Sequence, residues 1–349
     1  MSMQNDSAFS GQQSKPTTAF FLSVLRVGAV LGIVAAMAGF WGEINWFADL
    51  LSQLRVQWAI GLSVLVLLFV FARRWWWAIL CVIGFAINAI PIWPYIVGPA
   101  GFLNEPVVAQ ADSLEPAKDS LRLMSLNLLT RNRNWDGVIE SVRDASPDFL
   151  VLMEVDSVWQ QVCQTELATE YPHAVFSVRI DDFGIAFFSK LPFIQSMVFD
   201  SQTLELPSID VTISNLGAKP LRIIATHPIP PMDQGRWEAR NEQLFNIAAR
   251  FDENTCNVMV GDFNLTPWSP NFQKVVAAGN LTDASKKPSG PTPGLTLSGL
   301  TPTWYGFPTW IGGLKIDHAL VSNEVSVEDL EIGPDVDSDH RALILDFSF

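Results

Sequence analysis

The sequence has few charged residues, and basic residues are especially scarce. Only 17% of its 349 residues are Asp, Glu, Lys or Arg, whereas soluble domains average about 25%. The 22 basic residues against 36 acidic ones give a formal net charge of −14. Because binding the phosphates of a long duplex requires a basic surface, this composition argues against long double-stranded nucleic acid as a partner.

Cysteine is also scarce. The three cysteines are Cys81, Cys163 and Cys256, and no two of them stand at Cys-x-x-Cys spacing. An odd and low number of widely separated cysteines excludes a disulfide framework and a cysteine-based zinc site. The apolar content of 49% excludes a disordered chain and argues against an ordinary soluble enzyme.

Long apolar runs are concentrated in the first hundred residues. Three segments, about 20–41, 55–72 and 75–97, contain almost no charge, and each reaches or approaches the ~20 residues that a helix needs to cross a bilayer. Tryptophans cluster near the ends of these segments, as is typical of membrane interfaces. We predict three transmembrane helices. A signal peptide over the first segment and three buried helices of a soluble domain remain as alternatives.

The basic residues of the short loops predict the orientation. Lys15 lies in the N-terminal tail 1–19, and Arg73-Arg74 separates the second and third segments, whereas the loop 42–54 has no basic residue. Because basic loops stay on the cytoplasmic side, the tail and Arg73-Arg74 are expected there. An odd number of spans then places the remainder of the chain outside the cytoplasmic membrane.

The chain changes character after the third apolar segment. Residues 98–119, rich in Pro, Ala and acids, are predicted to be a linker. Residues 120–349 contain short apolar runs that alternate with helical patterns and are long enough for a sizeable core. Neighbouring strands without a helix between them also occur. This mixture predicts an α/β domain with much antiparallel pairing.

Six apolar runs of this domain each stop beside a distinctive polar residue. If the strands share a sheet, these side chains converge at one edge, where several carboxylates need a cation or shared protons. An oxygen-rich set without sulfur suits Mg²⁺, Mn²⁺ or Ca²⁺, and a hard cation beside two imidazoles suits hydrolysis of a phosphate ester. The side chains are Asn127, Glu154, His227, Asp262, Asn264, Asp317, Asp339 and His340.

In this order the motifs resemble the endonuclease/exonuclease/phosphatase superfamily, the DNase I-like fold, in its membrane-anchored bacterial branch. The resemblance covers residues 120–349. It implies a four-layer α/β/β/α sandwich, here preceded by an all-α region of three transmembrane helices. The motifs are Ser125-Leu126-Asn127, Asp148 to Glu154, Phe183 to Lys190, Ala225 to Pro228, Gly261-Asp262-Phe263-Asn264, Lys315 to His318 and Ser338-Asp339-His340.

The resemblance also implies a divalent metal, Mg²⁺ or Mn²⁺, and residues to hold it. Glu154 would bind the ion, with Asn127 nearby. Asp339 would support the metal side, either directly or through another group. Together the three residues would supply oxygen ligands only.

The same resemblance implies roles in catalysis. Asp262 would orient or deprotonate the attacking water, and Asn264 would hold a phosphate oxygen. His340 would bond the scissile phosphate, while Asp317 fixes its ring and tautomer. His227 would be a second imidazole and a candidate acid for the leaving group, unless it only packs in the proline-rich loop that follows it.

Other polar residues receive structural interpretations. Arg240 and Gln243, three positions apart on a predicted helix, are interpreted as a solvated face, with a role in the site as the alternative. His318 and His173 are left out of the site. Five aromatic residues could form either an apolar rim around the site or part of the core; they are Trp268, Trp304, Tyr305, Phe307 and Trp310.

These features predict a metal-dependent phosphoesterase anchored in the cytoplasmic membrane, with its catalytic domain outside. The substrate would be a small or lipid-linked phosphate, such as a polyprenyl pyrophosphate. An extracytoplasmic nuclease is the first alternative, and a membrane-tethered binding protein without turnover is the second. No oligomeric state follows from the sequence.

Overall fold

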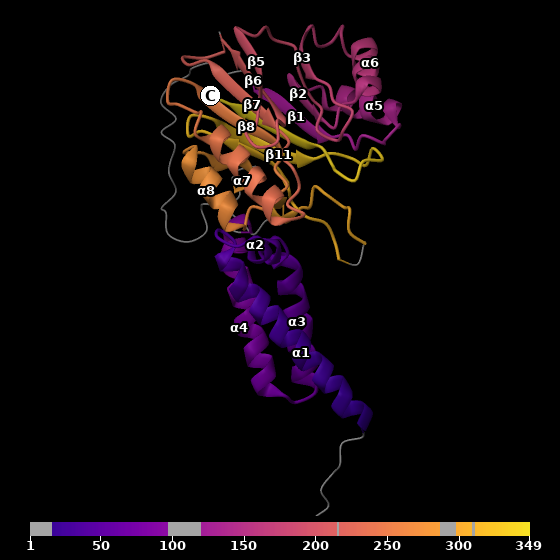
Figure 1. Ribbon diagram of the computed structural model, residues 1–349, viewed down its shortest axis with the longest axis vertical. Coiled ribbons are helices and arrows are strands. Elements are labelled where there is room, and N and C mark those ends of the chain that lie inside the picture. Colours follow the sequence, from indigo (N-terminus) through magenta and orange to yellow (C-terminus); the bar gives the residue numbers. More distant parts are fainter. Residues whose placement is uncertain (1–15, 97–119, 215, 287–297, 309–310) are drawn as a thin grey trace, which may run out of the picture.

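The computed structural model contains an α/β domain that stands on a stalk of helices (Figure 1). The predicted linker 98–119 and Trp310 lie outside the residues that the structure describes. Those residues are 16–96, 120–214, 216–286, 298–308 and 311–349.

The stalk consists of apolar helices. They are α1 (Pro16–Ala38) with the 3-10 turn η1 (Gly39–Trp41), α3 (Arg55–Phe71), and α4 (Trp75–Ile92) with the turn η2 (Trp93–Tyr95). Two helices are long and apolar enough to cross a membrane, Ala19–Trp41 and Trp75–Tyr95. A third span results only if α3 is counted together with the short helix that precedes it.

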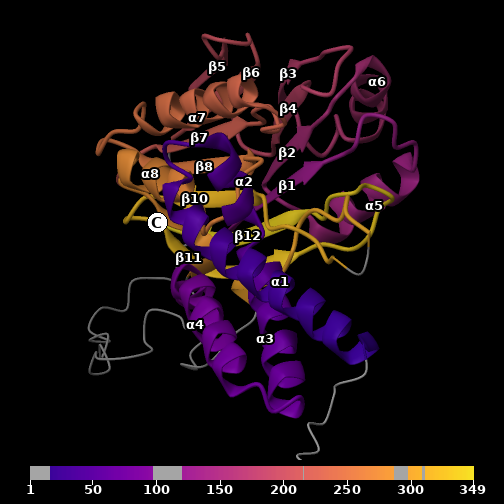
Figure 2. The ribbon, with the colours of Figure 1, turned by 60° about the horizontal axis from the view of Figure 1, so that its bottom comes forward.

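That short helix, α2 (Trp46–Gln53), corrects the prediction that 42–54 is a loop. It begins at Asn45, whose side chain accepts a hydrogen bond from the Ala48 N–H at 3.0 Å and so satisfies a free donor of the first turn. The chain then bends by 63° from α2 into α3. In Figure 1, α2 lies between the long helices of the stalk and the α/β domain, and in Figure 2 it overlaps the domain.

The α/β domain contains two six-stranded sheets. Within each sheet one central pair is parallel, β1 with β2 and β7 with β8, and the other paired strands are antiparallel. The first sheet has the order β11 (Ser326–Ile332), β12 (Leu343–Ser348), β1 (Leu121–Asn127), β2 (Phe149–Met153), β4 (Ile185–Ser189) and β3 (His173–Ser177). The second has the order β5 (Gln195–Asp200), β6 (Pro207–Ile213), β7 (Leu221–Thr226), β8 (Cys256–Asp262), β10 (Asp317–Val321) and β9 (Thr282–Asp283).

The sheets pack face to face, and helices cover both outer faces. Strand β2 shows why its sequence is apolar throughout: Phe149 and Val151 face the core between the sheets, and Leu150 faces the helices outside. Helices α5 (Trp135–Ala145) and α6 (Ser157–Glu166) cover the first sheet. Helices α7 (Gln234–Ala248) and α8 (Pro270–Ala278) cover the second. The predicted four-layer sandwich is therefore confirmed.

Three strands differ from the sequence prediction. Strand β9 has only two residues and was not predicted. Strand β11 was not predicted, because its sequence carries four acidic or hydroxyl side chains and it pairs with β12 at the edge of its sheet. Strand β10 begins at Asp317, whereas the sequence pattern placed a strand end there. Because β10 runs antiparallel to β8, its first residue still lies opposite Asp262, the last residue of β8.

A buried polar cluster joins α2 to the α/β domain. Asp49 of α2 forms an ion pair with Arg240 of α7, with 2.7 Å between Oδ2 and Nη2, and both side chains are fully buried. Trp237 Nε1 and Ser269 Oγ also donate to the Asp49 carboxylate, at 3.1 and 2.6 Å. The prediction that Arg240 and Gln243 face solvent is wrong, because both side chains are buried. Helix α2 covers Arg240, and the second sheet covers Gln243, which donates to Thr226 Oγ1 at 3.0 Å.

Substituting Asp49→Ala is expected to destabilise the protein by about 3–5 kcal/mol, because it leaves the Arg240 guanidinium buried without its counter-ion. The matched control is Glu43→Ala, which removes an exposed ion pair to Lys274 between the same two parts of the chain and should cost less than about 1 kcal/mol. Thermal unfolding in detergent measures both. An equal loss of stability in the two variants would contradict the conclusion that the Asp49–Arg240 ion pair holds α2 against the α/β domain.

Candidate active site

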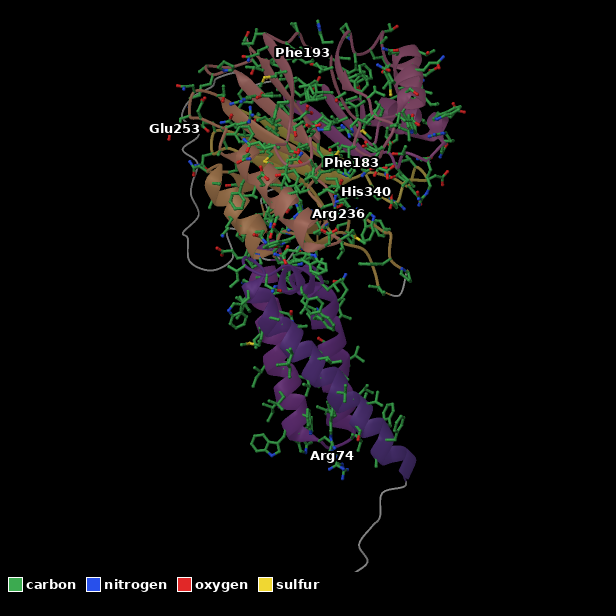
Figure 3. The ribbon with its side chains drawn as sticks, viewed as in Figure 1. Arg74, Phe183, Phe193, Arg236, Glu253 and His340 are labelled. Atoms are coloured by element: carbon green, nitrogen blue, oxygen red, sulfur yellow. The ribbon has the colours of Figure 1, made fainter. Side chains whose placement is uncertain are left out.

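The predicted site residues come together where strands of both sheets end. They line a pocket of about 600 Å³ in the α/β domain. In the first sheet, Asn127 is the last residue of β1 and Glu154 directly follows β2. In the second sheet, His227 directly follows β7 and Asp262 is the last residue of β8. The sequence pattern suggested a single sheet edge, whereas the structure builds the site from two. In Figure 3, His340 and Phe183 lie close together, and Arg74 marks the far end of the stalk.

Asp262 lies at the centre of these contacts. Its Oδ2 is 3.3 Å from His227 Nε2, 3.6 Å from His340 Nε2 and 3.3 Å from Asn127 Nδ2. Burial favours the neutral acid, but His340 and His227 outweigh it and lower the pKa of Asp262. Asp262 is therefore ionised at neutral pH, although its side chain is buried.

His340 is oriented by a second carboxylate. Its Nδ1 is 2.8 Å from Asp317 Oδ2, on the side of the ring opposite to Asp262. Burial opposes the charged imidazole, but Asp317 and Asp262 together raise the pKa of His340 to about 10. His340 is thus protonated at neutral pH. The backbone N–H of His340 donates to Ser338 Oγ at 3.0 Å, and Ser338 Oγ in turn donates to the Asn127 carbonyl oxygen at 2.7 Å.

His227 is the second imidazole of the site. Burial opposes its charged form, but the hydrogen bond that His227 donates to the Asp262 carboxylate, together with the charge of that carboxylate, raises the pKa of His227 despite that burial. Its ring packs against the ring of Phe183, with 5.3 Å between the centroids. A protonated imidazole held in this way can donate a proton to a leaving group.

Glu154 is held by neutral donors. Asn127 Nδ2 donates to Glu154 Oε1 at 3.0 Å, and the N–H and Oγ1 of Thr130 donate to Oε2 at 2.7 and 3.0 Å. Glu154 and Asn264 both adopt left-handed backbone conformations, with φ of 63° and 49°. This conformation is costly for Glu, whereas Asn adopts it readily, and costly backbone conformations are often found at functional sites.

The chain comes especially close to itself before Asp262. Gly261 has a φ of 143°. A Cβ atom at this position would lie 2.0 Å from the carbonyl oxygen of Thr226. Only glycine fits there, and it brings the ends of β7 and β8 together.

The residues around Glu154 fit a hard divalent cation. Glu154 and Asp339 offer carboxylate oxygens, which Mg²⁺ and Mn²⁺ prefer. Asn127 presents its Nδ2 to Glu154, and its Oδ1 accepts a hydrogen bond from the Leu129 N–H at 3.0 Å, so in this structure Asn127 positions Glu154 and does not offer the cation an oxygen ligand. Asp339 Oδ2 accepts a hydrogen bond from Trp304 Nε1 at 3.0 Å, while its buried Oδ1 has no hydrogen-bond partner within the described part of the chain. Such an oxygen is suited to coordinate an ion.

A second group of possible ligands lies nearby. Asp262, Asp317 and His340 have donor atoms within 4.8 Å of one another. Because protonated His340 already contacts both carboxylates, this group is compensated in charge without a cation. The cation therefore fits better beside Glu154, whose partners are neutral.

Seven of the eight predicted residues line the pocket, and Asp317 lies behind His340. His318, which the prediction left out, points the other way: its Nε2 is 2.8 Å from the carbonyl oxygen of Leu265, beside Phe272. His173 lies on the edge strand β3. Its ring is 5.9 Å from that of Phe193, which lies at the far side of the domain in Figure 3.

Sequence reasoning missed several residues that shape the site. Thr130, which holds Glu154, carried no recognisable signal. Trp304 and Phe307 of the predicted aromatic set do line the pocket, whereas Trp268 is buried beneath α2, with its Nε1 3.1 Å from the Gln53 carbonyl. The pocket also includes residues of α2, which no pattern connected to the site.

A family model for the "Endonuclease/Exonuclease/phosphatase family" matches residues 124–340. The chain belongs to this family. The family's members hydrolyse phosphate ester bonds and typically use a divalent metal.

Solved structures share the fold. An endonuclease/exonuclease/phosphatase from Beutenbergia cavernae is 22% identical, with a TM-score of 0.55 over 66% of this chain and 72% of that chain. TDP2 of D. rerio, complexed with a single-strand DNA product, is 14% identical, with a TM-score of 0.54 over 66% and 100%. An endonuclease/exonuclease/phosphatase from Bacteroides vulgatus is 18% identical, with a TM-score of 0.52 over the same shares. Among curated proteins, no sequence matches this chain.

Substituting Glu154→Ala is expected to lower the rate of hydrolysis about 10²–10³-fold, the range for removing a group that stabilises charge in the transition state. Raised Mg²⁺ should restore part of the rate, because the variant binds the ion more weakly. Glu140→Ala, on the exposed side of α5, serves as the control and should behave as the unmodified protein. Mg²⁺ titrations of the rate provide the measurement, and an unchanged midpoint would remove the metal assignment.

Proposed function

We propose that this protein is a membrane-anchored, divalent-metal-dependent phosphoesterase. It hydrolyses a phosphodiester, phosphomonoester or pyrophosphate by in-line attack of water. The observation that carries the proposal is the chain of contacts from Glu154 through Asn127 and Asp262 to His340 and Asp317, all within or behind one pocket. This series of contacts has an anionic end at Glu154, which suits a cation, and a cationic group at His340, which suits a phosphate.

The roles follow from protonation states and free hydrogen-bonding groups. Protonated His340 donates to a phosphate oxygen and stabilises charge that develops there. Asn264 Nδ2 donates one N–H to the Pro228 carbonyl at 3.0 Å, which leaves its other N–H for a phosphate oxygen. Ionised Asp262 orients the attacking water. His227 protonates the leaving group.

A bound Mg²⁺ or Mn²⁺ would polarise the phosphoryl oxygen and neutralise charge. Glu154 would hold it, with Asp339 as a further oxygen donor and with Asn127 positioning the Glu154 carboxylate. No covalent enzyme intermediate is part of this scheme, since the residues around Asp262 position water.

The substrate panel is the direct test. The full-length protein in detergent with Mg²⁺ is offered a chromogenic phosphodiester, a polyprenyl pyrophosphate and plasmid DNA. We expect turnover of one of the first two and little cleavage of DNA, because the chain has a net charge of −14. His340→Ala should lower the rate by about 10²–10⁴-fold and controls for contaminants. Faster cleavage of DNA than of the other two would favour the alternative, an extracytoplasmic nuclease, and no turnover of any substrate would favour a binding protein.

We also propose that the helices of the stalk cross the cytoplasmic membrane and leave the catalytic domain outside. A reporter that is active only outside the cytoplasm, fused after residue 115, should be active. The same reporter fused after Arg74 should be silent, because the Arg73-Arg74 loop is expected on the cytoplasmic side. The opposite pattern would reverse the orientation.

A further inference from the structure

The pocket of the active site has two chemically different halves. One half contains the polar residues described above. The other half is apolar. Its residues come from loops of the α/β domain and from α2 with the residue that follows it. They include Leu50, Leu54, Met232, Phe307, Leu314 and Ile316. Leu50 lies in α2 and Leu54 directly follows its last residue, at the bend into α3; both side chains line the pocket.

The anchor holds this wall in a fixed position. Gln53, between the two leucines, accepts a hydrogen bond from the Thr266 N–H at 2.6 Å through its Oε1. Arg240, which pairs with Asp49, also donates to the carbonyl oxygen of Asn264 at 2.9 Å. The buried contacts of α2 thus reach the residue expected to hold phosphate. A helix fixed in this way forms part of the site and is more than a tether.

Apolar side chains also reach the surface beside this half of the pocket. Trp46 of α2 donates to the Pro231 carbonyl at 2.7 Å. The side chains next to these two, Phe47 and Met232, are 61% and 69% exposed. Exposed large apolar groups on both parts of the chain suit contact with hydrocarbon at the membrane surface.

We propose that α2 is a substrate-binding element, and that the substrate is a phosphate ester or pyrophosphate of a long apolar alcohol. The phosphate lies at the polar half, and the first carbons of the chain contact Leu50 and Leu54. Nucleotide bases would leave polar groups unpaired against this wall, whereas each buried methylene of a hydrocarbon chain contributes about 0.8 kcal/mol. This inference rests on the proposed function of the same site.

The test compares decyl phosphate with ethyl phosphate, which share a phosphate and differ in the apolar chain. Binding to the full-length protein in phosphatidylcholine nanodiscs with Mg²⁺ is measured by calorimetry. The same titration into nanodiscs without protein corrects for partition of the alkyl phosphate into the lipid. We expect decyl phosphate to bind at least about tenfold more tightly. Leu50→Asn and Leu54→Asn should each weaken decyl phosphate about tenfold and leave ethyl phosphate unchanged. Leu51→Asn, on the same helix outside the pocket, is the matched control.

The outcomes separate this inference from the proposed function. Turnover of a phosphate ester without a preference for the longer chain overturns the role of α2 alone. The role of α2 is also overturned if Leu50→Asn and Leu54→Asn both still bind decyl phosphate more tightly than ethyl phosphate. It is overturned as well if these variants weaken the binding of the two phosphates equally. A preference lost only in the pocket variants supports the binding role, even if every substrate of the panel fails and the proposed catalysis fails with it.

Discussion

The structure depends on the burial of one ionised carboxylate. Asp262 is removed from water, and a carboxylate in that position is stable only if several donors are held around it. Its partners come from both sheets. His227 follows β7 of the second sheet, to which Asp262 itself belongs, whereas Asn127 ends β1 of the first. The strand ends of the two sheets must therefore meet. The sandwich supplies that meeting point, and the charge in turn constrains how the sheets are aligned.

Much of the catalytic domain could be predicted from the sequence. Strands covered on both faces are continuous apolar runs, so a polar residue directly after such a run stands out, as Glu154 does after β2. Helical patterns between the apolar runs were also recognisable and correspond to the helices of the outer layers. The edge strand β11 was not, because an exposed edge tolerates acidic side chains and leaves no apolar run.

The docking of the anchor could not be predicted, for a physical reason. Helix α2 has only eight residues, and its polar side chains look like those of a loop facing water. Asp49 is buried because Arg240, 191 positions away, faces it. A buried ion pair leaves no periodic pattern on either side, since each residue alone resembles a solvated charge. The same reasoning explains why α7 was interpreted as a solvated face.

The segment after β8 connects these two parts of the molecule. Near its start, Asn264 contributes to the pocket, and a few residues later Thr266 and Ser269 bond to Gln53 and Asp49 of α2. Because one short segment contributes to the pocket and also bonds to α2, these two parts cannot shift independently. The pocket therefore keeps a fixed height relative to the apolar helices of the stalk. A site at a fixed height can select substrates by where their phosphate lies relative to hydrocarbon, in addition to the chemistry of the phosphate itself.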